Sequence, residues 1–301
     1  MLGEHFVISG APALAFPLSD IWCEVKISPS EHAHYVAHVP GDEDRETIEN
    51  FMPRATYAVI DALRMDPGSQ SFKVESTSNF PVSRGLGSSA SFAVALARAF
   101  DSYRKLIINE NADWDELVKA TTAVEKVFHG SPSGVDAATI LSNRPIRFEK
   151  GVVLRELTNN AIDIVVVDSG SRDNCSNLVK QVIGFRERNP EQWQGMAQAV
   201  IGLADTCEKA LAAGDAVTVG KVVHESHAIL SELGLSNSTI ETIISEAVSR
   251  GALAGKISGA GGGGAVLLVA KKGEGRALAA VMGDAGWRVV ATDSAVGGSR
   301  D

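Results

Sequence analysis

The chain has 301 residues, carries a formal net charge of −9 and is 45% hydrophobic. This length is enough for two domains with substantial cores. The acidic balance argues against nucleic acid or an anionic membrane surface as a partner. No apolar run approaches the roughly 18 residues that span a bilayer, and no signal-peptide pattern is present. We therefore expect a soluble, cytoplasmic protein.

The cysteines and histidines do not suggest a disulfide framework or a metal centre. Three cysteines are scattered singly, at Cys23, Cys175 and Cys207, which favours reduced thiols. His32, His34 and His38 cluster in a polar segment that is rich in acids, and we interpret this segment as a solvated loop.

The N-terminal half begins with strand and helix signals. Apolar and polar residues alternate over 21–27, which predicts a strand with one buried face. A helix is expected over about 48–64, where the turn Asp66-Pro67-Gly68 follows it. A second strand is expected around Phe72 and Val74.

Residues 81–90, the phosphate loop below, join this strand to a helix that begins near Ala90. Glycines let the backbone adopt positive φ and approach a ligand closely. The first turn of the helix offers unpaired N–H groups and the positive end of its dipole. Ser88 and Ser89 are expected to cap these amides or to give a hydroxyl to a phosphate or its magnesium. An ordinary strand-to-helix turn is the alternative.

A helix-turn motif follows at 125–136. Asp113 and Glu116 read as a capping box that opens the helix. Glu125 lies near its C-terminal end, where a cation would be preferred, and Asp136 follows within a Gly/Pro/Ser turn. Two carboxylates on neighbouring rigid elements suit one magnesium ligand and one proton acceptor, and solvated surface acids are the alternative.

The second half has a strand near 146–154 and a domain boundary at the polar residues 158–160, which divides the chain into 1–158 and 159–301. An apolar strand at 162–167 opens the second domain. Helices follow at about 177–188, 190–213, 216–233 and 240–250, and strands at 254–258, 265–269 and 287–290. Strands with helices on one face indicate the α+β class.

The segment Lys256-Ile257-Ser258-Gly259-Ala260-Gly261-Gly262-Gly263-Gly264 has five glycines in its last six residues. Such a run is entropically costly inside a compact domain, unless the backbone must pass close to a bulky charged group. A dinucleotide-binding fold is disfavoured, because this run precedes a strand and no acid-ended strand follows the phosphate loop. A Walker A loop is absent from the sequence.

Four motifs resemble those of the GHMP small-molecule kinases. They are GEHFVISGAPALA from Gly3, PVSRGLGSSAS from Pro81, EKVFHGSPSGVD from Glu125 and KISGAGGGG from Lys256. Their order along the chain is that of the family, and FHGSPSGVD points to the mevalonate kinase branch. The resemblance implies a two-domain α+β fold: an N-terminal domain like ribosomal protein S5 domain 2 and a ferredoxin-like C-terminal domain, with ATP and substrate between them.

The resemblance also implies roles for single residues. Asp136 would take the proton of the substrate hydroxyl, and Ser133 lies in the same catalytic turn. Ser89 and Glu125 would bind Mg²⁺. The ATP contacts would come from Pro81, Arg84, Gly85, Leu86, Gly87, Ser88, Ser89, Ala90, Gly259, Ala260, Gly261 and Gly262. The substrate contacts would come from Glu4, His5, Ser258 and Cys175.

Two features depart from the family pattern. The family has a lysine a few residues before GEH, and no residue of this sequence matches it. An internal start, an enzyme that works without the lysine and an impaired enzyme all stay open. The family usually has a threonine where Cys175 stands, and a thiol is the weaker hydrogen-bond donor.

The resemblance implies an ATP- and Mg²⁺-dependent kinase that converts mevalonate to 5-phosphomevalonate in isoprenoid precursor synthesis. The alternatives are a kinase of the same superfamily for phosphomevalonate, a sugar or homoserine, and a non-catalytic ATP-binding paralogue. The oligomeric state stays open, with a homodimer as one alternative.

Overall fold

The computed structural model of the chain describes residues 1–40, 42–66, 68–82, 84–129, 132–172 and 175–293. The chain divides into two compact units, which we call unit 1 and unit 2. Unit 1 holds residues 1–20, 84–86 and 144–301, and unit 2 holds residues 21–83 and 87–143. No helix in the described ranges is long and apolar enough to cross a membrane.

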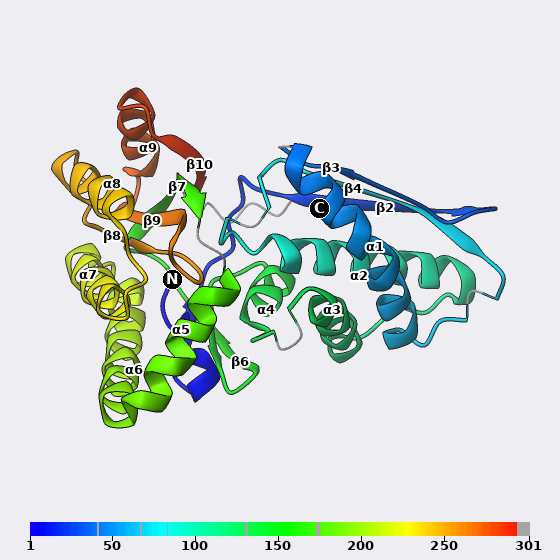
Figure 1. Cartoon of the computed structure of the whole chain (residues 1–301), viewed down its shortest axis with the longest axis horizontal. Coiled ribbons are helices and arrows are strands. Elements are labelled where there is room, and N and C mark those ends of the chain that lie inside the picture. Colours follow the sequence, from blue (N-terminus) through cyan, green and yellow to red (C-terminus); the bar gives the residue numbers. More distant parts are fainter. Residues whose placement is uncertain (41, 67, 83, 130–131, 173–174, 294–301) are drawn as a thin grey trace. The chain divides into compact units, whose positions relative to one another are not determined.

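Unit 2 is a three-stranded sheet with helices against it. The strands are β2 (Cys23–Ser30), β3 (His34–His38) and β4 (Ser71–Ser78), in the order β2-β4-β3. The helices are α1 (Asp42–Ala62), α2 (Ser88–Ile108), α3 (Trp114–His129) and α4 (Val135–Ser142). Figure 1 shows α1, α2 and α3 gathered on one side of this sheet. Apolar side chains from the sheet and these helices, such as Val74, Leu96 and Val124, form its core.

The predicted capping box is confirmed at the start of α3. The amide of Glu116 donates to Asp113 Oδ1 at 2.8 Å, and the amide of Asp113 donates to Glu116 Oε2 at 3.1 Å. These reciprocal bonds satisfy two of the N–H groups that a helix start leaves unpaired. They fix where α3 begins, and therefore which side chains its last turn presents.

The predicted solvated loop around the N-terminal histidines is partly wrong. His34 and His38 are the ends of β3, which pairs in parallel with β4. His32, His34 and His38 are nevertheless exposed, as expected. The polar composition hid the strand, because β3 is held by backbone pairing with a segment about 40 residues further along the chain.

Unit 1 contains a four-stranded antiparallel sheet in the order β10-β7-β9-β8. Its strands are β7 (Ile162–Arg172), β8 (Ala254–Ile257), β9 (Gly263–Lys271) and β10 (Arg288–Asp293). In chain order this arrangement is 4-1-3-2, the strand order of the predicted ferredoxin-like fold. The predicted α+β class is therefore confirmed in this unit.

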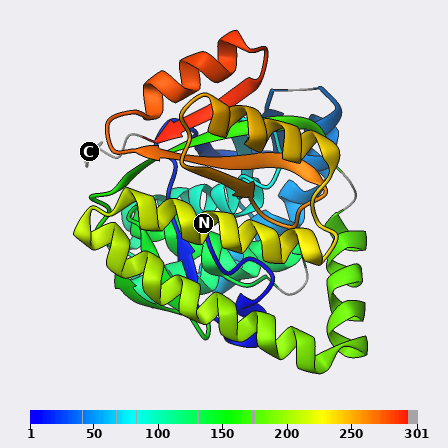
Figure 2. The ribbon, with the colours of Figure 1, turned by 90° about the vertical axis from the view of Figure 1, so that its left-hand side faces the viewer.

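Among the described residues, five helices belong to this part of unit 1. They are α5 (Cys175–Arg188), α6 (Pro190–Ala213), α7 (Ala216–Glu232), α8 (Ser238–Ser249) and α9 (Gly275–Asp284). Four of them lie between β7 and β8 in the sequence, and α9 connects β9 to β10. Figure 2 shows α8 and α9 against the sheet.

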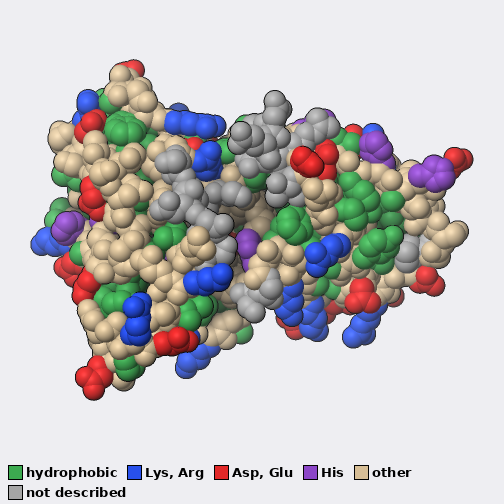
Figure 3. Space-filling view, viewed as in Figure 1, with side chains coloured by type: hydrophobic (Ala, Val, Ile, Leu, Met, Phe, Trp, Pro, Cys, Tyr) green, Lys and Arg blue, Asp and Glu red, His purple; other side chains and the backbone are tan. Residues whose placement is uncertain are grey.

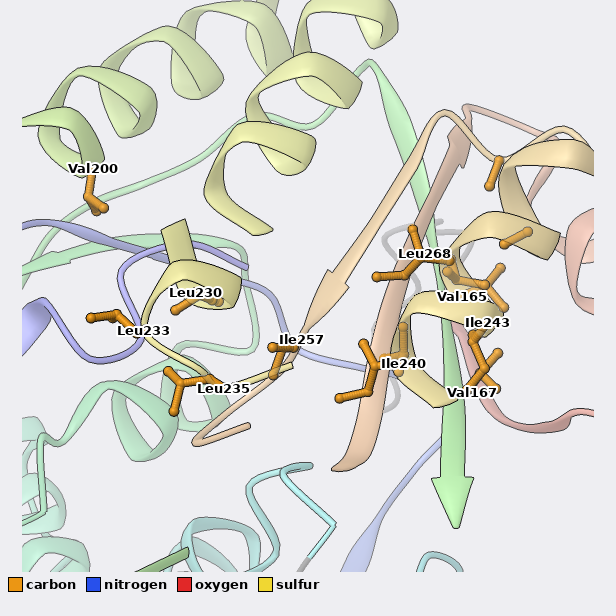
Figure 4. Packing of buried hydrophobic residues seen from close by; sticks show 14 of the residues in the cluster. Val165, Val167, Val200, Leu230, Leu233, Leu235, Ile240, Ile243, Ile257 and Leu268 are labelled. Atoms are coloured by element: carbon orange, nitrogen blue, oxygen red, sulfur yellow. The ribbon is translucent and has the colours of Figure 1, made fainter. Parts of the chain in front are cut away.

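The core of unit 1 lies between this sheet and its helices. Every residue from Ala161 to Asp168 is buried, which explains why the run 164–167 in the middle of β7 is apolar rather than alternating. Figure 4 shows Val165 and Leu268 of the sheet close to Ile243 of α8. Burial of each such side chain contributes roughly 1.5–3 kcal/mol of transfer free energy, so this layer holds the sheet rigidly beneath the loop that joins β8 to β9.

A second, smaller sheet in unit 1 corrects two predictions. It consists of β1 (Ala13–Ala15), β5 (Ile146–Glu149) and β6 (Val152–Glu156), in the order β1-β5-β6. The single strand predicted over 146–154 is thus a hairpin, which turns where Lys150 and Gly151 have positive φ. Because β1 pairs with β5, residues 1–20 join unit 1, which differs from the predicted division at residue 158.

The described cysteines are free thiols, as predicted. Burial raises the pKa of the Cys23 thiol to about 11 and that of Cys207 to about 12. Both side chains are therefore protonated and unreactive near neutral pH.

Large hydrophobic side chains are exposed on unit 2, among them Tyr57 and Leu106. Figure 3 shows hydrophobic side chains gathered on the surface of this unit. Exposed hydrophobic side chains also occur on the surfaces of monomers, so the homodimer stays a prediction.

Candidate active site

The phosphate loop turns through two glycines with positive φ, Gly85 at 76° and Gly87 at 70°. Gly87 is the N-cap of α2, and no side chain caps the helix there. Ser88 and Ser89 follow this N-cap, inside the first turn of α2, and their predicted role of giving a hydroxyl to a phosphate or its magnesium stays a prediction. A helix start that follows a glycine turn in this way is the arrangement that binds anions.

Asp136 lies next to the phosphate loop, within unit 2. A Cβ atom added to Gly87 would lie 3.7 Å from Asp136 Cβ and 3.8 Å from its Oδ2. Asp136 stands in the first turn of α4, which begins after Gly134 in the left-handed conformation. Ser133 precedes that turn, and its Oγ accepts a hydrogen bond from the amide of Val135 at 3.4 Å. The prediction that Asp136 and the loop serve one site agrees with this contact.

Glu125 is a buried carboxylate on α3, with only 4% of its surface exposed. Its Oε2 has no hydrogen-bond partner among the residues that the structure describes. Burial, and in second place the charge of Asp136, raise the pKa of Glu125 to about 7. A buried, unpaired carboxylate oxygen costs stability, so its presence points to a partner that is a cation or a donor.

His129 joins this group, and the sequence analysis did not identify it. Its Nε2 lies 2.8 Å from Ser89 Oγ. His129 is four residues after Glu125 on α3, so the two side chains share a face of the helix. Burial lowers the pKa of His129, and the charge of Asp136 opposes that effect. The spacing of four residues between Glu125 and His129 in EKVFH was the sequence signal that could have placed both side chains in one site.

The residues present fit a magnesium ion with an incomplete protein ligand set. Mg²⁺ prefers oxygen ligands and is usually held by one or two carboxylates together with water and substrate phosphates. Glu125 offers the buried oxygen without a partner, and Ser89 offers a hydroxyl. Within the described residues, no three or more His, Cys, Asp or Glu side chains form a metal site.

The C-terminal glycine loop, residues 258–264, joins β8 to β9 in unit 1. Its glycines all have positive φ, between 73° and 127°. A Cβ atom on Gly261 would lie 2.8 Å from both Cβ and the carbonyl oxygen of Leu235. The amide of Gly262 donates to that same carbonyl at 2.8 Å. Glycine is therefore required at Gly261 by close contact as well as by conformation.

Glu4 and His5 lie against this same loop. Lys256, which is fully buried, donates from Nζ to the carboxylate of Glu4 and, at 2.8 Å, to the carbonyl of Ile257. His5 Nε2 lies 3.1 Å from the carbonyl oxygen of Ala260. Sequence analysis placed Lys256 at the head of its motif but gave it no partner.

Arg84 and Ser258 are joined to neighbouring backbone in unit 1. The Arg84 guanidinium donates to the carbonyl of Gly170 and lies 3.9 Å from Asp168 Oδ2. Ser258 Oγ donates to the carbonyl of Gly85 at 3.4 Å. The predicted nucleotide contact of Arg84 and the predicted substrate contact of Ser258 stay predictions.

The remaining predicted residues fall into two groups. Pro81 and Ala90 are buried, and Leu86 is half-buried. Cys175 begins α5, but its side chain lies outside the part of the chain that the structure describes. Its predicted substrate contact therefore also stays a prediction.

Two family profiles match the chain. The profile of the GHMP kinases N terminal domain matches residues 53–144, and that of the GHMP kinases C terminal domain matches residues 207–286. Together they cover more than half of the sequence.

Individual relatives agree with these matches. The chain is 28% identical to the mevalonate kinase of Thermococcus gammatolerans, over 93% of this chain and 89% of that protein. The crystal structure of L. major mevalonate kinase in complex with R-mevalonate superposes with a TM-score of 0.81 and 24% identity, and covers 94% of this chain and 88% of that one. Streptococcus pneumoniae phosphomevalonate kinase superposes with a TM-score of 0.75 at 17% identity, and the superposition covers 97% of this chain and 96% of that one. These superpositions confirm the predicted two-domain α+β fold.

Proposed function

Because the chain belongs to the GHMP kinases, we propose that it transfers the γ-phosphoryl group of ATP to the primary hydroxyl of mevalonate. The product is 5-phosphomevalonate, an intermediate of isoprenoid precursor synthesis. The relatives that match most of the chain are mevalonate kinases, and the motif FHGSPSGVD follows the pattern of that branch.

One observation of the structure supports this chemistry most directly. The buried carboxylate of Glu125, with an oxygen that has no partner in the described residues, is electrostatically coupled to Asp136 beside the phosphate loop. Two neighbouring carboxylates in different surroundings suit two roles, one as a cation ligand and one as a proton acceptor. A purely structural Glu125 would be expected to have both of its carboxylate oxygens paired.

Phosphoryl transfer needs positioning and charge stabilisation more than covalent help from the protein. Asp136 orients the hydroxyl of the alcohol and accepts its proton, and Ser133 shapes the turn before it. Glu125 and Ser89 hold Mg²⁺, which when bound neutralises charge on the phosphates. The amides of Gly87, Ser88 and Ser89 bind phosphate oxygens at the start of α2.

The residues of unit 1 complete the proposed assignment. Amides of Gly259, Ala260 and Gly261 bind phosphate oxygens, and the positive φ of the glycines lets this backbone approach them closely. The amide of Gly262 donates to the carbonyl of Leu235, so Gly262 contributes close approach of the backbone rather than a donor. Ser258 and Cys175 contact the substrate.

A second candidate is a different alcohol within the same family. The phosphomevalonate kinase superposes almost as well as the mevalonate kinases do, so the fold alone does not choose the substrate. The substrate assignment therefore rests on sequence identity to mevalonate kinases.

The test is an assay of ADP release with mevalonate, phosphomevalonate, homoserine and galactose as acceptors. Turnover with mevalonate alone is expected. Asp136→Asn should lower kcat by roughly 10² or more, the contribution of an orienting base. It should leave ATP binding unchanged, because the amide is nearly isosteric.

Asp115→Asn is the matched control, because Asp115 is also an exposed aspartate in the first turn of a helix of unit 2. It should keep the wild-type kcat. Preferred turnover of another acceptor would replace the substrate assignment. ATP binding without turnover of any acceptor would identify a non-catalytic paralogue, and an active Asp136→Asn variant would make Asp136 structural.

A further inference from the structure

The segment Gly3 to Phe6 is held in one conformation at both of its ends. Gly3 has a φ of 94°, and a Cβ atom there would lie 2.5 Å from the carbonyl oxygen of Pro12. The ring of Phe6 stacks on Trp193, with centroids 4.4 Å apart and an interplanar angle of 21°. Glu4 and His5, between these two anchors, are therefore presented in a fixed direction.

The carboxylate of Glu4 forms an ion pair with the ammonium group of Lys256. Lys256 is fully buried, so its ammonium group has lost its hydration, and a buried charge of this kind is tolerated only when it is paired and hydrogen-bonded. Burial by itself would raise the pKa of Glu4, but the charge and hydrogen bond of Lys256, together with the charge of the N-terminus, outweigh burial and the pKa is lowered. Glu4 is therefore ionised, and its carboxylate is committed to Lys256.

His5 is bonded to the backbone of the glycine loop. Since a carbonyl oxygen can only accept, the contact with Ala260 requires a hydrogen on Nε2 of His5. Burial lowers the pKa of His5, which keeps the ring neutral. A neutral ring with this tautomer has no spare positive charge for an anionic substrate.

The bonded Ala260 stands between Gly259 and Gly261, both of which have positive φ. The contact of Gly262 with Leu235 fixes the next amide. Ordering one backbone residue costs roughly 1–2 kcal/mol of conformational entropy, and glycine costs most. If the loop is already ordered before the nucleotide binds, binding does not include this loss of conformational entropy, and the affinity is higher.

We infer that Glu4 and His5 are positioning residues for the C-terminal glycine loop: the Glu4–Lys256 ion pair fixes the loop's entry from β8, and the His5–Ala260 hydrogen bond fixes its middle. This inference rests on the proposed function and assigns the two residues to nucleotide affinity. It differs from the substrate contact that the sequence suggested, because both side chains are already engaged within the protein.

The test separates nucleotide affinity from acceptor affinity. Glu4→Gln, Lys256→Met and the double variant are compared for the Kd of AMPPNP, for the KM of ATP and for the KM of the acceptor. Each single variant should weaken AMPPNP binding about tenfold, which is the typical effect of losing one interaction between two coupled residues. The KM of ATP should rise in parallel. The KM of the acceptor should stay within about twofold. The double variant should be no worse than the worse single variant, because the two residues act as one unit.

His5 gives a second and milder test. His5→Phe keeps a ring but removes the donor to Ala260, and should weaken AMPPNP binding. His5→Gln keeps an N–H donor at a similar reach, and should recover most of the affinity. A role in packing alone would instead rank the phenylalanine variant above the glutamine variant.

A buried arginine with an ion-pair partner elsewhere in unit 1 is the control. Arg147, which is 7% exposed, bonds Asp205 at 2.7 Å. Arg147→Met should lower the unfolding temperature without changing the AMPPNP Kd, which separates general destabilisation from loop positioning.

The inference would be overturned if Glu4→Gln and His5→Phe raised the KM of the acceptor and left AMPPNP binding unchanged. AMPPNP binding does not depend on which alcohol is the acceptor, so an error in the substrate assignment does not affect this result. A wild-type protein that failed to bind AMPPNP would refute both the inference and the proposed function.

Discussion

Glu125→Gln should make the protein more stable at pH 8 while abolishing most of its metal-dependent turnover. Burial and Asp136 raise the pKa of Glu125 from 4.5 to about 7 in the folded protein. The folded state therefore binds this proton more tightly than the unfolded state does. The contribution of Glu125 to the free energy of unfolding is therefore most favourable below about pH 4.5, and it decreases as the pH rises towards 7. Glutamine carries no charge at any pH and removes this slope.

The size of the effect follows from the same values. A difference of one pKa unit corresponds to about 1.4 kcal/mol, so ionised Glu125 costs the folded state about 3 kcal/mol above pH 7. Its side chain is 96% buried from solvent, since only 4% is exposed, so little screening is expected. The variant should exceed the wild type by less than about 1 kcal/mol at pH 5 and by up to about 3 kcal/mol at pH 8.

Urea unfolding at pH 5, 6, 7 and 8, followed by circular dichroism without added metal, measures this difference. Glu110→Gln, at an exposed carboxylate of unit 2, is the control for loss of one negative charge. Parallel pH profiles for wild type and Glu125→Gln would refute the reasoning, because they would mean that Glu125 ionises without cost. Unchanged turnover at limiting magnesium would remove the metal role of Glu125.

Two further predictions concern the loops. Gly261→Ala should lower stability by roughly 1–3 kcal/mol, because its Cβ would lie 2.8 Å from Leu235. Gly10→Ala should cost less, because Gly10 has a φ of 88° but nothing within 4 Å of an added Cβ. The melting temperatures of the two variants provide the comparison, and equal losses would exclude the contact with Leu235. His129→Ala should weaken binding of Mg·AMPPNP several-fold, because the hydroxyl of Ser89 loses its 2.8 Å partner. Calorimetry measures this affinity, and His129→Gln should recover part of it. Equal affinities in all three proteins would show that His129 has no role in nucleotide binding.

Much of the fold could be predicted because its signals are local. Helix α6 begins and ends at the predicted residues, with proline at its first position and Gly214 after its last. The capping box of α3 was visible as two residues three apart. The predicted strand at 21–27 overlaps β2, and the predicted strand at 162–167 lies within β7.

The errors in the fold arose where pairing is not local. β3 has a polar sequence and exists because β4 offers it a parallel edge. The hairpin of β5 and β6 was predicted as one strand, because its turn uses Lys150 at positive φ, which a sequence rarely signals. Residues 1–20 were assigned to the N-terminal domain, whereas the pairing of β1 with β5 places them in unit 1.

The sequence by itself determined the chemistry that the chain can support: the glycine loops, the serines of the first helical turn and the two carboxylates of the helix-turn motif are local patterns. Only the tertiary structure decided which of these side chains are free. Glu4 is bonded to Lys256, which is 252 residues away, and Ser89 is bonded to His129, 40 residues away. Glu125 is buried because of what packs around α3. Burial and partners depend on distant segments that meet only after folding, so no local pattern encodes them.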